Sequence, residues 1–528
     1  MINAILTDFA PGWAITHAAP LLVVVPLIVA TLLVFIPSGR VSWFLSVIAT
    51  LASLFYALIL LGLVQASGPV GSELARAGID TNLRAVGLLS YELGGWAPPA
   101  GIEFRVDALN AMILFLVASI GVLTSIFSWP TVNAEIRTEK QNLFYSAYLV
   151  CFAGLCGVAI TGDAFNLFVF LEISSISTYV LVALGATRDR RALPAAFNYL
   201  VMGTIGATFY VIGVGFLYAA TGTLNMADLS EMLPGLTSNR TVQAGFAFII
   251  IGLGLKAAMW PLHQWLPNAY AYAPSFVTTF LAATATKVAL YALIRWLFTV
   301  FSPEFAFEAA SFEWIFAPLA IAAMVVCSFQ AVFQVDVRRT LAYSSVAQVG
   351  YMLLGVSLAT AAGLSAGLFH LFNHALMKGG LFMAVAGVVL TYQGTTLKDF
   401  AGLGRSAPWT MTAFAICGLS LIGVPLTAGF QSKVALLAAT LENGWWWAAA
   451  LIVFSSVLAV IYMGRILEAV FFKAPVNPRK VRKEAPLLLL VPLWALALAN
   501  LLIGFDAGLP FELSTQAAES IFTAGSAR

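Results

Sequence analysis

Six ionisable side chains lie inside long apolar stretches of this sequence, where proteins rarely place a charge. They are Glu172, Lys256, Lys287, His370, His374 and Lys433. A charge in the hydrocarbon core of a membrane costs about 3 kcal/mol on insertion scales unless another group pairs or hydrates it. Carboxylate, ammonium and imidazole groups all exchange protons. A series of them therefore predicts proton or ion transfer across a membrane.

The first two of these residues have the properties of a switchable ion pair. Lys256 stands in FIIIGLGLKAAMWPLHQWLP, residues 248–267, and Glu172 stands in NLFVFLEISSIS. Burial favours the neutral amine of a lysine, whereas a nearby carboxylate favours the charged form. Two unit charges about 4 Å apart attract by about 4 kcal/mol at an effective dielectric constant near 20. Movement of Glu172 is therefore predicted to load or unload a proton on Lys256. The alternatives are a static ion pair that fixes packing, or a lysine that reaches the surface.

Two prolines interrupt the apolar stretches beside a lysine. Pro261 follows Lys256 by five positions, and Pro425 precedes Lys433 in GVPLTAGFQSK. Proline lacks a backbone donor and clashes with the preceding turn, so each helix is expected to break or kink there. An opened helix at membrane depth must face protein or water rather than lipid. His263, which follows Pro261, is an accessory candidate at the mouth of a pathway, with a helix cap as the alternative.

Two further segments carry ionisable groups on helix faces. TFLAATATKVALYALIRWLF places Lys287 in mid-membrane and Arg295 two turns later, where the arginine either joins a relay or reaches the surface. In AGLFHLFNHALMKGGLFMAV, His370, His374 and Lys378 recur every four residues and share one helix face. A metal site would need a third ligand, and none is visible nearby. We therefore favour a proton pathway, with Lys378 as an accessory group and plain packing of the histidines as the alternative.

The composition indicates a membrane protein. Of 528 residues, 61% are hydrophobic and 9% are charged, and the mean hydropathy is +0.94, whereas soluble domains are about 25% charged. The four cysteines stand in apolar runs without metal-ligand spacing or a CxxC pair, so we interpret them as packing residues. No basic and aromatic cluster indicates nucleic-acid binding. No haem, phosphate or dinucleotide motif is present, so neither a cofactor nor a metal is expected.

Apolar windows predict an all-α polytopic membrane protein with about fourteen transmembrane helices. The windows are 15–36, 42–66, 107–129, 143–161, 164–186, 196–220, 241–262, 276–300, 314–334, 340–360, 363–391, 411–440, 445–472 and 486–505. The first window is too long, and too poor in flanking cations, for a cleaved signal peptide.

The two proline breaks predict an internal repeat. The fourth to eighth windows and the ninth to thirteenth windows each contain one broken helix, which is the sequence sign of a repeat-built transporter. Because five is an odd number, the second block begins on the other side of the membrane, and the two five-helix repeats are inverted. The predicted division is 1–142 (three helices and an external loop), 143–300 (first repeat), 314–472 (inverted second repeat) and 486–528 (last helix and a short tail).

The basic residues predict the orientation in the membrane. If the N-terminus lies outside, the inside loops hold fifteen Lys and Arg residues and the outside segments hold five. Cytoplasmic loops carry such an excess, so both termini are expected outside. Lys256 then lies toward the inner end of its helix and Lys433 toward the outer end of its own, which suggests one entrance and one exit. Residues 67–106 are expected to form an ordered or partly ordered external loop.

Several motifs resemble those of one known family, in unbroken order within residues 105–473. They are NLFVFLEISSIS, GLGLKAAMWPLHQWLPNAYAYAPS, ATKVALYALIR, VRRTLAYSSVAQVGYMLLG, GLFHLFNHALMKGGLF and GVPLTAGFQSK. Together they resemble the antiporter-like subunits shared by Mrp-type cation/proton antiporters and respiratory complex I, and most of all the D subunits of Mrp sodium/proton antiporters. The sequence differs from the M subunit of complex I, which usually has a glutamate where Lys433 stands. It also has GVPL where many relatives have GVPP.

The resemblance implies inverted repeats, a Glu172–Lys256 pair, a hydrated central axis and assembly with other membrane subunits of an Mrp-type complex. We expect a secondary transporter subunit rather than an enzyme, placed in a bacterial inner membrane. Protons would pass from the cytoplasmic side through Lys256, Lys287 and the histidine pair to Lys433, in exchange for Na⁺ or another monovalent cation. One alternative is a proton-pumping subunit of a redox complex, such as an NADH:quinone oxidoreductase or a membrane-bound hydrogenase. The other is a passive membrane scaffold, which would leave the buried ionisable groups unexplained.

Overall fold

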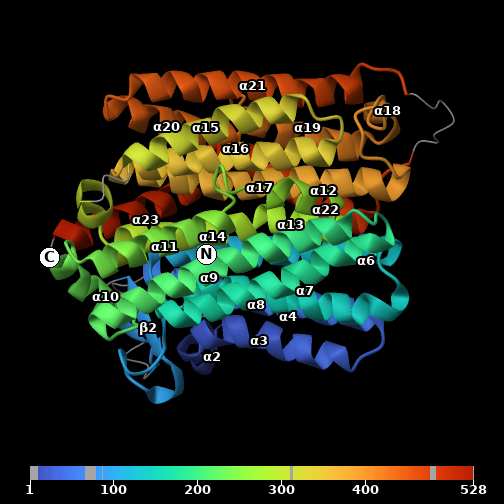
Figure 1. Ribbon diagram of the computed structural model, residues 1–528. Coiled ribbons are helices and arrows are strands. Elements are labelled where there is room, and N and C mark those ends of the chain that lie inside the picture. Colours follow the sequence, from blue (N-terminus) through green and yellow to red (C-terminus); the bar gives the residue numbers. More distant parts are fainter. Residues whose placement is uncertain (1–9, 66–78, 86, 310–312, 476–482, 527–528) are drawn as a thin grey trace.

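The computed structural model describes residues 10–65, 79–85, 87–309, 313–475 and 483–526. Helices that run nearly parallel to one another form the body of the molecule, and a small β-sheet lies at one end of this bundle, on the left of Figure 1. We call this the sheet end. The other end, where α18 (Leu403–Ser406) lies, is the far end.

Within the described residues, six long apolar helices and the short helix α2 form the N-terminal part of the bundle. They are α2 (Gly12–Thr16), α3 (Ala18–Val34), α4 (Gly39–Gln65), α6 (Ala108–Glu135), α7 (Gln141–Ile160), α8 (Ala164–Ala183) and α9 (Ala192–Thr221), with short turns η3 (Thr138–Lys140) and η4 (Leu184–Thr187) between them. Carboxylates begin two of these helices: Asp107 accepts from Leu109 N and Asn110 N, and Asp163 accepts from Asn166 N. Such caps satisfy backbone donors that have no partner inside the helix.

The middle of the chain contains two broken helices. Its elements are α10 (Met226–Met232), η5 (Leu233–Leu236), α11 (Arg240–Lys256), α12 (Trp265–Tyr272), α13 (Ser275–Ala283), α14 (Ala285–Ile294), and the π-helical turns η6 (Arg295–Val300) and η7 (Glu304–Ala309). The break predicted at Pro261 separates α11 from α12. The break between α13 and α14 was not predicted, because no proline stands there. Thr284 Oγ1 instead donates to Phe280 O at 2.7 Å, a local bond that competes with regular helix geometry.

The C-terminal part contains one more broken helix and one long unbroken helix. Its elements are α15 (Glu313–Val332), α16 (Val337–Ser357), α17 (Ala361–Tyr392), α18, α19 (Pro408–Ile422), α20 (Ala428–Glu442), α21 (Trp446–Phe471), α22 (Leu487–Phe505) and α23 (Gly508–Ser526). The break predicted at Pro425 separates α19 from α20, and Gly423 ends α19 with φ +92°. Helix α17, with 32 residues, packs against α13, α16, α19, α20, α22 and α23. It therefore contacts pieces of two of the broken helices.

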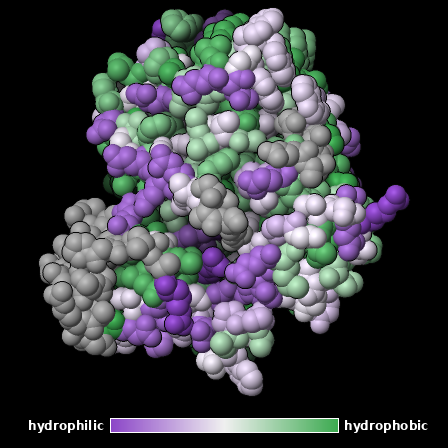
Figure 2. All heavy atoms as spheres, turned by 90° about the vertical axis from the view of Figure 1, so that its left-hand side faces the viewer, coloured by the Kyte–Doolittle hydropathy of each residue, from purple (hydrophilic) through white to green (hydrophobic). Residues whose placement is uncertain are grey.

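The sheet lies inside the segment that was predicted to be an external loop. It is antiparallel, with β1 (Leu83–Ala85), β2 (Leu88–Glu92) and β3 (Glu103–Val106) in that order, and η2 (Leu93–Gly95) follows β2. Hydrophilic side chains gather over much of the end of the molecule that Figure 2 faces. A polar cavity of about 310 Å³ lies between the sheet and α10, lined by Glu92, Glu103, Arg105, Asp228 and Glu231 among others.

The all-α polytopic class is confirmed, with the small sheet as an addition to it. Each of the fourteen predicted windows overlaps a helix, and within the described residues ten helices are long and apolar enough to cross a membrane. The number fourteen, the inverted repeats and the domain division stay predictions. The segment predicted as a short tail forms a further helix, α23, which packs against α6 and α17.

Candidate functional site

Glu172 of α8 and Lys256 at the end of α11 lie side by side in the interior. Lys256 Nζ donates to Ser175 Oγ at 2.5 Å and lies 3.4 Å from Glu172 Oε1. The lysine side chain is 6% exposed, and the glutamate side chain is 23% exposed. A buried ammonium is thus held by a carboxylate and a hydroxyl of the same helix, and the carboxylate is the less enclosed partner.

A small cavity extends from Lys256 toward α14. Its volume is about 30 Å³, enough for a water molecule where polar groups are present to bind one. It is lined by Ser174, Ser175, Thr178, Tyr199 and Lys256 on one side and by Ala285, Val288 and Ala289 of α14 among others. Because Lys287 belongs to α14, the cavity leads from the first lysine to the helix that carries the second.

Lys287 is buried, and the break at Thr284 supplies its partner. Its ammonium donates to Ala282 O, near the end of α13, and lies 3.4 Å from Thr286 Oγ1. The C-terminal carbonyl groups of a helix carry partial negative charge, which favours a cation there. Among the described residues, none of the ion pairs includes Lys287. The lysine is therefore held by peptide and hydroxyl dipoles rather than by a carboxylate.

The two histidines of α17 lie parallel and fully buried. Their ring centres are 6.3 Å apart with 12° between the planes. His370 has partners for both nitrogens: Ser432 Oγ lies 2.9 Å from Nδ1, and Gln348 Oε1 lies 2.7 Å from Nε2. His374 has none for either nitrogen among the described residues. His370 is thus held between α16 and α20, whereas no described side chain or backbone group fixes the nitrogens of His374.

The two accessory candidates are held by neighbouring helices. Lys378 donates to Leu341 O at 2.8 Å and to Ser344 Oγ, both on α16. His263 is 6% exposed and lies in the turn between α11 and α12, with its Nε2 3.8 Å from Cys327 Sγ of α15. Helix α12 has no side-chain cap, so the helix-cap alternative for His263 is wrong.

Lys433 reaches back from α20 to the end of α19. Its ammonium donates to Leu421 O at 3.1 Å, to Ile422 O at 2.9 Å and to Ser456 Oγ at 3.2 Å. It also lies 5.0 Å from the ring centre of Tyr351, a distance at which the ring face attracts a cation. The same tyrosine ring lies 5.5 Å from the ring of His370. Tyr351 thus joins the histidine pair to the last lysine.

Proton exchange is the chemistry that these groups share. Within the described residues, no group of three or more His, Cys, Asp or Glu side chains is placed to hold a metal ion. The four cysteines are buried and free. These groups are a carboxylate, several amines and two imidazoles, and the contacts described above link Glu172 to Lys256 and, through Tyr351, His370 to Lys433.

Comparison with known proteins places the chain in a family. The family model described as "NADH:quinone oxidoreductase/Mrp antiporter, TM" matches residues 161–459, which is more than half of the chain. The chain belongs to this family. The match includes every one of the six core candidates, and it confirms the resemblance that the sequence motifs indicated.

Individual members of the NADH:quinone oxidoreductase/Mrp antiporter family come from both branches. The N subunit of the NADH-quinone oxidoreductase of Desulforudis audaxviator (strain MP104C) is 42% identical over 426 residues, covering 78% of this chain and 84% of the relative. The D subunit of the Na(+)/H(+) antiporter of Alkalihalophilus pseudofirmus (strain ATCC BAA-2126 / JCM 17055 / OF4) is 30% identical over 453 residues, covering 86% and 90%. A chain in the structure of the Mrp complex from Dietzia sp. DQ12-45-1b matches with a TM-score of 0.85 and 26% identity, covering 96% and 97%. The chain is thus a multi-pass, antiporter-like membrane subunit.

In this antiporter-like subunit, Arg295 neither joins the lysines nor reaches the surface. Its guanidinium binds the Asp107 carboxylate at two points, Nη1 to Oδ2 at 2.6 Å and Nη2 to Oδ1 at 2.8 Å. Asp107 caps α6, so the pair ties the start of that helix to η6. The sequence carries one weak sign of this pair, an aspartate at the first position of a predicted span.

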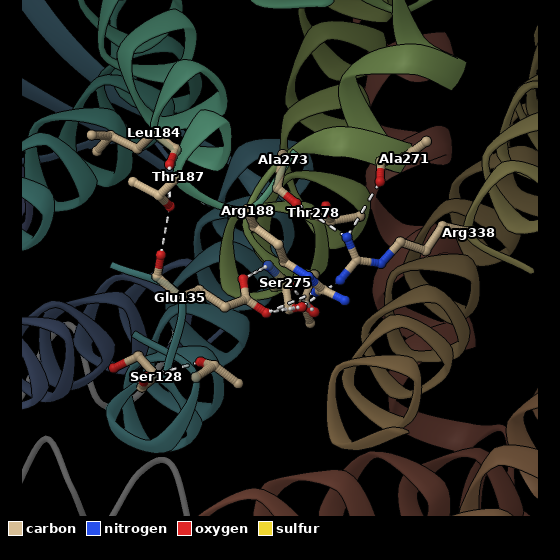
Figure 3. A network of polar contacts seen from close by, with 12 residues as sticks. Ser128, Glu135, Leu184, Thr187, Arg188, Ala271, Ala273, Ser275, Thr278 and Arg338 are labelled. Carbon is tan, nitrogen blue, oxygen red and sulfur yellow. Dashed lines mark hydrogen bonds and ion pairs between the residues drawn. The ribbon is translucent and has the colours of Figure 1, made fainter. Parts of the chain in front are cut away.

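A second polar network, at the far end, was not recognised from the sequence (Figure 3). Arg338 at the start of α16 donates to Ala271 O at 3.3 Å, to Ala273 O at 3.2 Å and to Ser275 Oγ. Glu135 accepts from Ser275 N at 2.7 Å and lies 3.4 Å from Arg188 Nη1. We call Glu135, Arg188, Ser275 and Arg338 the far-end clasp. It joins α16 to the linker between α12 and α13, and through Arg188 to the segment that follows α8.

Proposed function

We propose that this chain is the proton-translocating subunit of a multisubunit monovalent cation/proton antiporter. The observation that carries the proposal is the contact of buried Lys256 with Glu172 at a helix break, beside a small cavity that extends toward α14. The protonation of a buried lysine depends strongly on whether a carboxylate lies beside it. A small displacement of Glu172 therefore suffices to change whether Lys256 carries a proton.

The relay then runs from one nitrogen to the next. A proton enters beside the broken helix α11/α12 and binds the Lys256 amine while Glu172 is close. When Glu172 moves away, the ammonium gives its proton through the cavity to the neutral amine of Lys287. From there the proton passes over the imidazoles of α17 to Lys433. Each donor becomes neutral as its acceptor becomes charged, so one positive charge advances at each step.

The counter-ion, the orientation and the partners complete the proposal. The proton flow is exchanged for Na⁺ or another monovalent cation, with other membrane subunits of an Mrp-type complex as partners. The chain lies in a bacterial inner membrane with both termini outside. Support comes from the likeness to the D subunit of the Alkalihalophilus pseudofirmus antiporter and to the Mrp complex from Dietzia sp. DQ12-45-1b.

We also propose that residues 143–300 and 314–472 are two inverted five-helix units. In the first unit, a residue of its second helix, Glu172 of α8, contacts Lys256 at the break of the fourth helix. In the second unit, a residue of its second helix, Tyr351 of α16, contacts Lys433 at the break of the fourth helix. The two breaks thus have corresponding neighbours, with a carboxylate in one unit and an aromatic ring in the other.

A second candidate function is favoured by one specific likeness. The relative with 42% identity is a subunit of an NADH-quinone oxidoreductase. The same relay would then work as a proton pump in a redox complex, with the redox reaction taking place in other subunits. Both candidates use the same six residues and differ in the source of energy.

Ion exchange in inverted membrane vesicles that contain the native complex distinguishes the two candidates. A preformed pH gradient is challenged with sodium, potassium and lithium salts in turn. We expect cation-dependent loss of the gradient, absent from the Lys256→Ala complex. No response to any cation, together with proton pumping after NADH or another reductant is added, would instead support the redox candidate.

A further inference from the structure

The ammonium of Lys433 is surrounded by neutral oxygens rather than by a carboxylate. Leu421 O and Ile422 O are the last carbonyl groups of α19, and Ser456 Oγ comes from α21. Within the described residues, no ion pair includes Lys433, although its side chain is buried. Helix-end carbonyls and an aromatic ring face therefore balance its charge.

Such a set of ligands is not specific for an ammonium group. Backbone carbonyls of unwound segments and of half-helix C-terminal ends bind alkali-metal cations in membrane transporters. Carbonyl and hydroxyl oxygens also replace the hydration shell of potassium in selectivity filters. The ammonium of Lys433 thus lies where a dehydrated monovalent cation would find suitable ligands.

The site lies beside the surface of the chain, as an ion site requires. Gly423 and Val424, which follow the two carbonyls, are half-buried, and Pro425 and Leu426 are exposed, Leu426 at 57%. Two other buried lysines have similar oxygen partners but lack this access. Lys287 is 1% exposed and Lys378 is 0% exposed. Among the lysines held by carbonyl and hydroxyl oxygens, Lys433 is therefore the best placed to exchange with an ion from outside the chain.

We propose that Leu421 O, Ile422 O and Ser456 Oγ form a binding site for an alkali-metal cation, which the Lys433 ammonium and the cation occupy in turn. The inference rests on the proposed exchange of protons for a monovalent cation. Lys433 gives its proton to water at the exposed break, the neutral amine leaves the oxygens, and the cation takes its place. One positive charge replaces another, so the charge at the site is conserved. In the reverse step, protonation of the amine displaces the cation.

Direct binding of radiolabelled Na⁺ and of the K⁺ substitute Rb⁺ to the purified complex tests this site without transport. Lys433→Met removes the ammonium at nearly the same volume. We expect the Lys433→Met complex to bind one additional cation, with an affinity that does not change with pH. Lys378→Met, which frees a similar carbonyl and hydroxyl in a closed position, is the matched control and gains no binding. An assembled Lys433→Met complex that binds no more cation than the Lys378→Met complex would overturn the inference.

A variant that retains the lysine provides the second readout. Ser456→Ala removes one oxygen ligand, and we expect it to raise the cation concentration for half-maximal exchange about fivefold, the size of effect that the loss of one neutral ligand produces. Ser357→Ala, which removes a buried hydroxyl that binds Leu354 O of its own helix, leaves that concentration unchanged. In the unaltered complex, protons on Lys433 compete with the cation for the oxygens. We therefore expect the cation concentration for half-maximal exchange to rise about tenfold for each pH unit of acidification, over the range in which Lys433 titrates.

The inference would also be overturned if this concentration changed neither with pH nor in the Ser456→Ala variant. If the complex still exchanged protons for Na⁺ in that case, the proposed antiport would stand and only the cation site would be wrong. If the complex bound the cation at this site but exchanged no protons, the proposed antiport would be wrong and the cation site would stand.

Discussion

Glu172 and Lys256 stand 84 residues apart in the chain, and their charged groups lie 3.4 Å apart in the fold. Lys256 is the last residue of α11, the first half of a broken helix. No further helix turn therefore packs beside its side chain on the C-terminal side. The glutamate side chain is nearly four times as exposed as that of the lysine, 23% against 6%. We infer that the glutamate is the partner that moves.

Removal of either charge at this pair is expected to stop transport. Lys256→Ala and Glu172→Ala should each abolish exchange without preventing assembly, whereas Glu172→Asp should be milder, because the charge remains and only its reach shortens. The measurement is the decay of a pH gradient in vesicles with equal amounts of assembled complex. The matched control is Glu468→Ala, which breaks the surface pair of Glu468 and Lys473, also 3.4 Å apart but half exposed. Full exchange in an assembled Lys256→Ala complex would contradict the proposed proton relay through Lys256.

The hydroxyl of Ser175 is expected to contribute to the same switch. Its Oγ lies closer to Lys256 Nζ than the carboxylate does, 2.5 Å against 3.4 Å. A hydrogen bond to a charged group contributes about 1.5–3 kcal/mol, so Ser175→Ala should slow exchange by about tenfold or more. Initial rates at several pH values measure this. Ser177→Ala is the control, because that hydroxyl binds carbonyls of its own helix, and an equal effect of both variants would point to packing alone.

The pair of Arg295 and Asp107 is expected to determine stability rather than transport. Breaking a buried ion pair from one side costs about 3–5 kcal/mol, because the remaining charge stays buried without a partner. Arg295→Gln should therefore lower the unfolding temperature of the detergent-solubilised complex. Arg84→Gln breaks an exposed pair with Glu92 and should leave that temperature nearly unchanged. Normal stability of the Arg295→Gln complex would contradict this role.

The far-end clasp is expected to hold the segment between α12 and α13 in place. Arg338→Lys keeps the charge but cannot reproduce the forked contacts with Ala271 O, Ala273 O and Ser275 Oγ. We expect faster amide hydrogen exchange in residues 271–283 and slower transport. Arg465→Lys is the control, since that side chain binds Val332 O of α15 instead. Unchanged protection of residues 271–283 in Arg338→Lys would show that other contacts hold this segment.

Local chemistry explains which features the sequence predicted. A proline beside a buried lysine marks a break, because both effects act within one helix turn, and the breaks at Pro261 and Pro425 are present. The break at Thr284 has no such mark. It depends on the hydrogen bond from the Thr284 side chain to a backbone carbonyl of the preceding turn. Threonine also makes this bond in unbroken helices, so the residue type alone does not predict a break.

Partners far apart in the chain were not predictable in the same way. Arg295 binds a carboxylate 188 residues away, and a long basic side chain near a helix end looks the same whether it pairs or reaches the surface. The partners of Lys433 include backbone carbonyls, which every residue possesses, so no residue type marks them. The partner of Lys256 was identifiable from the sequence, because Glu172 lies in the middle of an apolar span, where a carboxylate needs a cation beside it to stay charged.

His374 has a consequence for the resting protein. Neither of its ring nitrogens has a partner among the described residues, although His370, one turn away, has two. The hydrogen-bonded path is therefore interrupted between Lys287 and His370. A membrane potential does work of about 2.3 kcal/mol on each charge per 100 mV, and a continuous proton wire would let that energy leak away. We infer that a side chain or a water molecule has to contact the His374 ring before a proton passes, so that this residue limits such a leak.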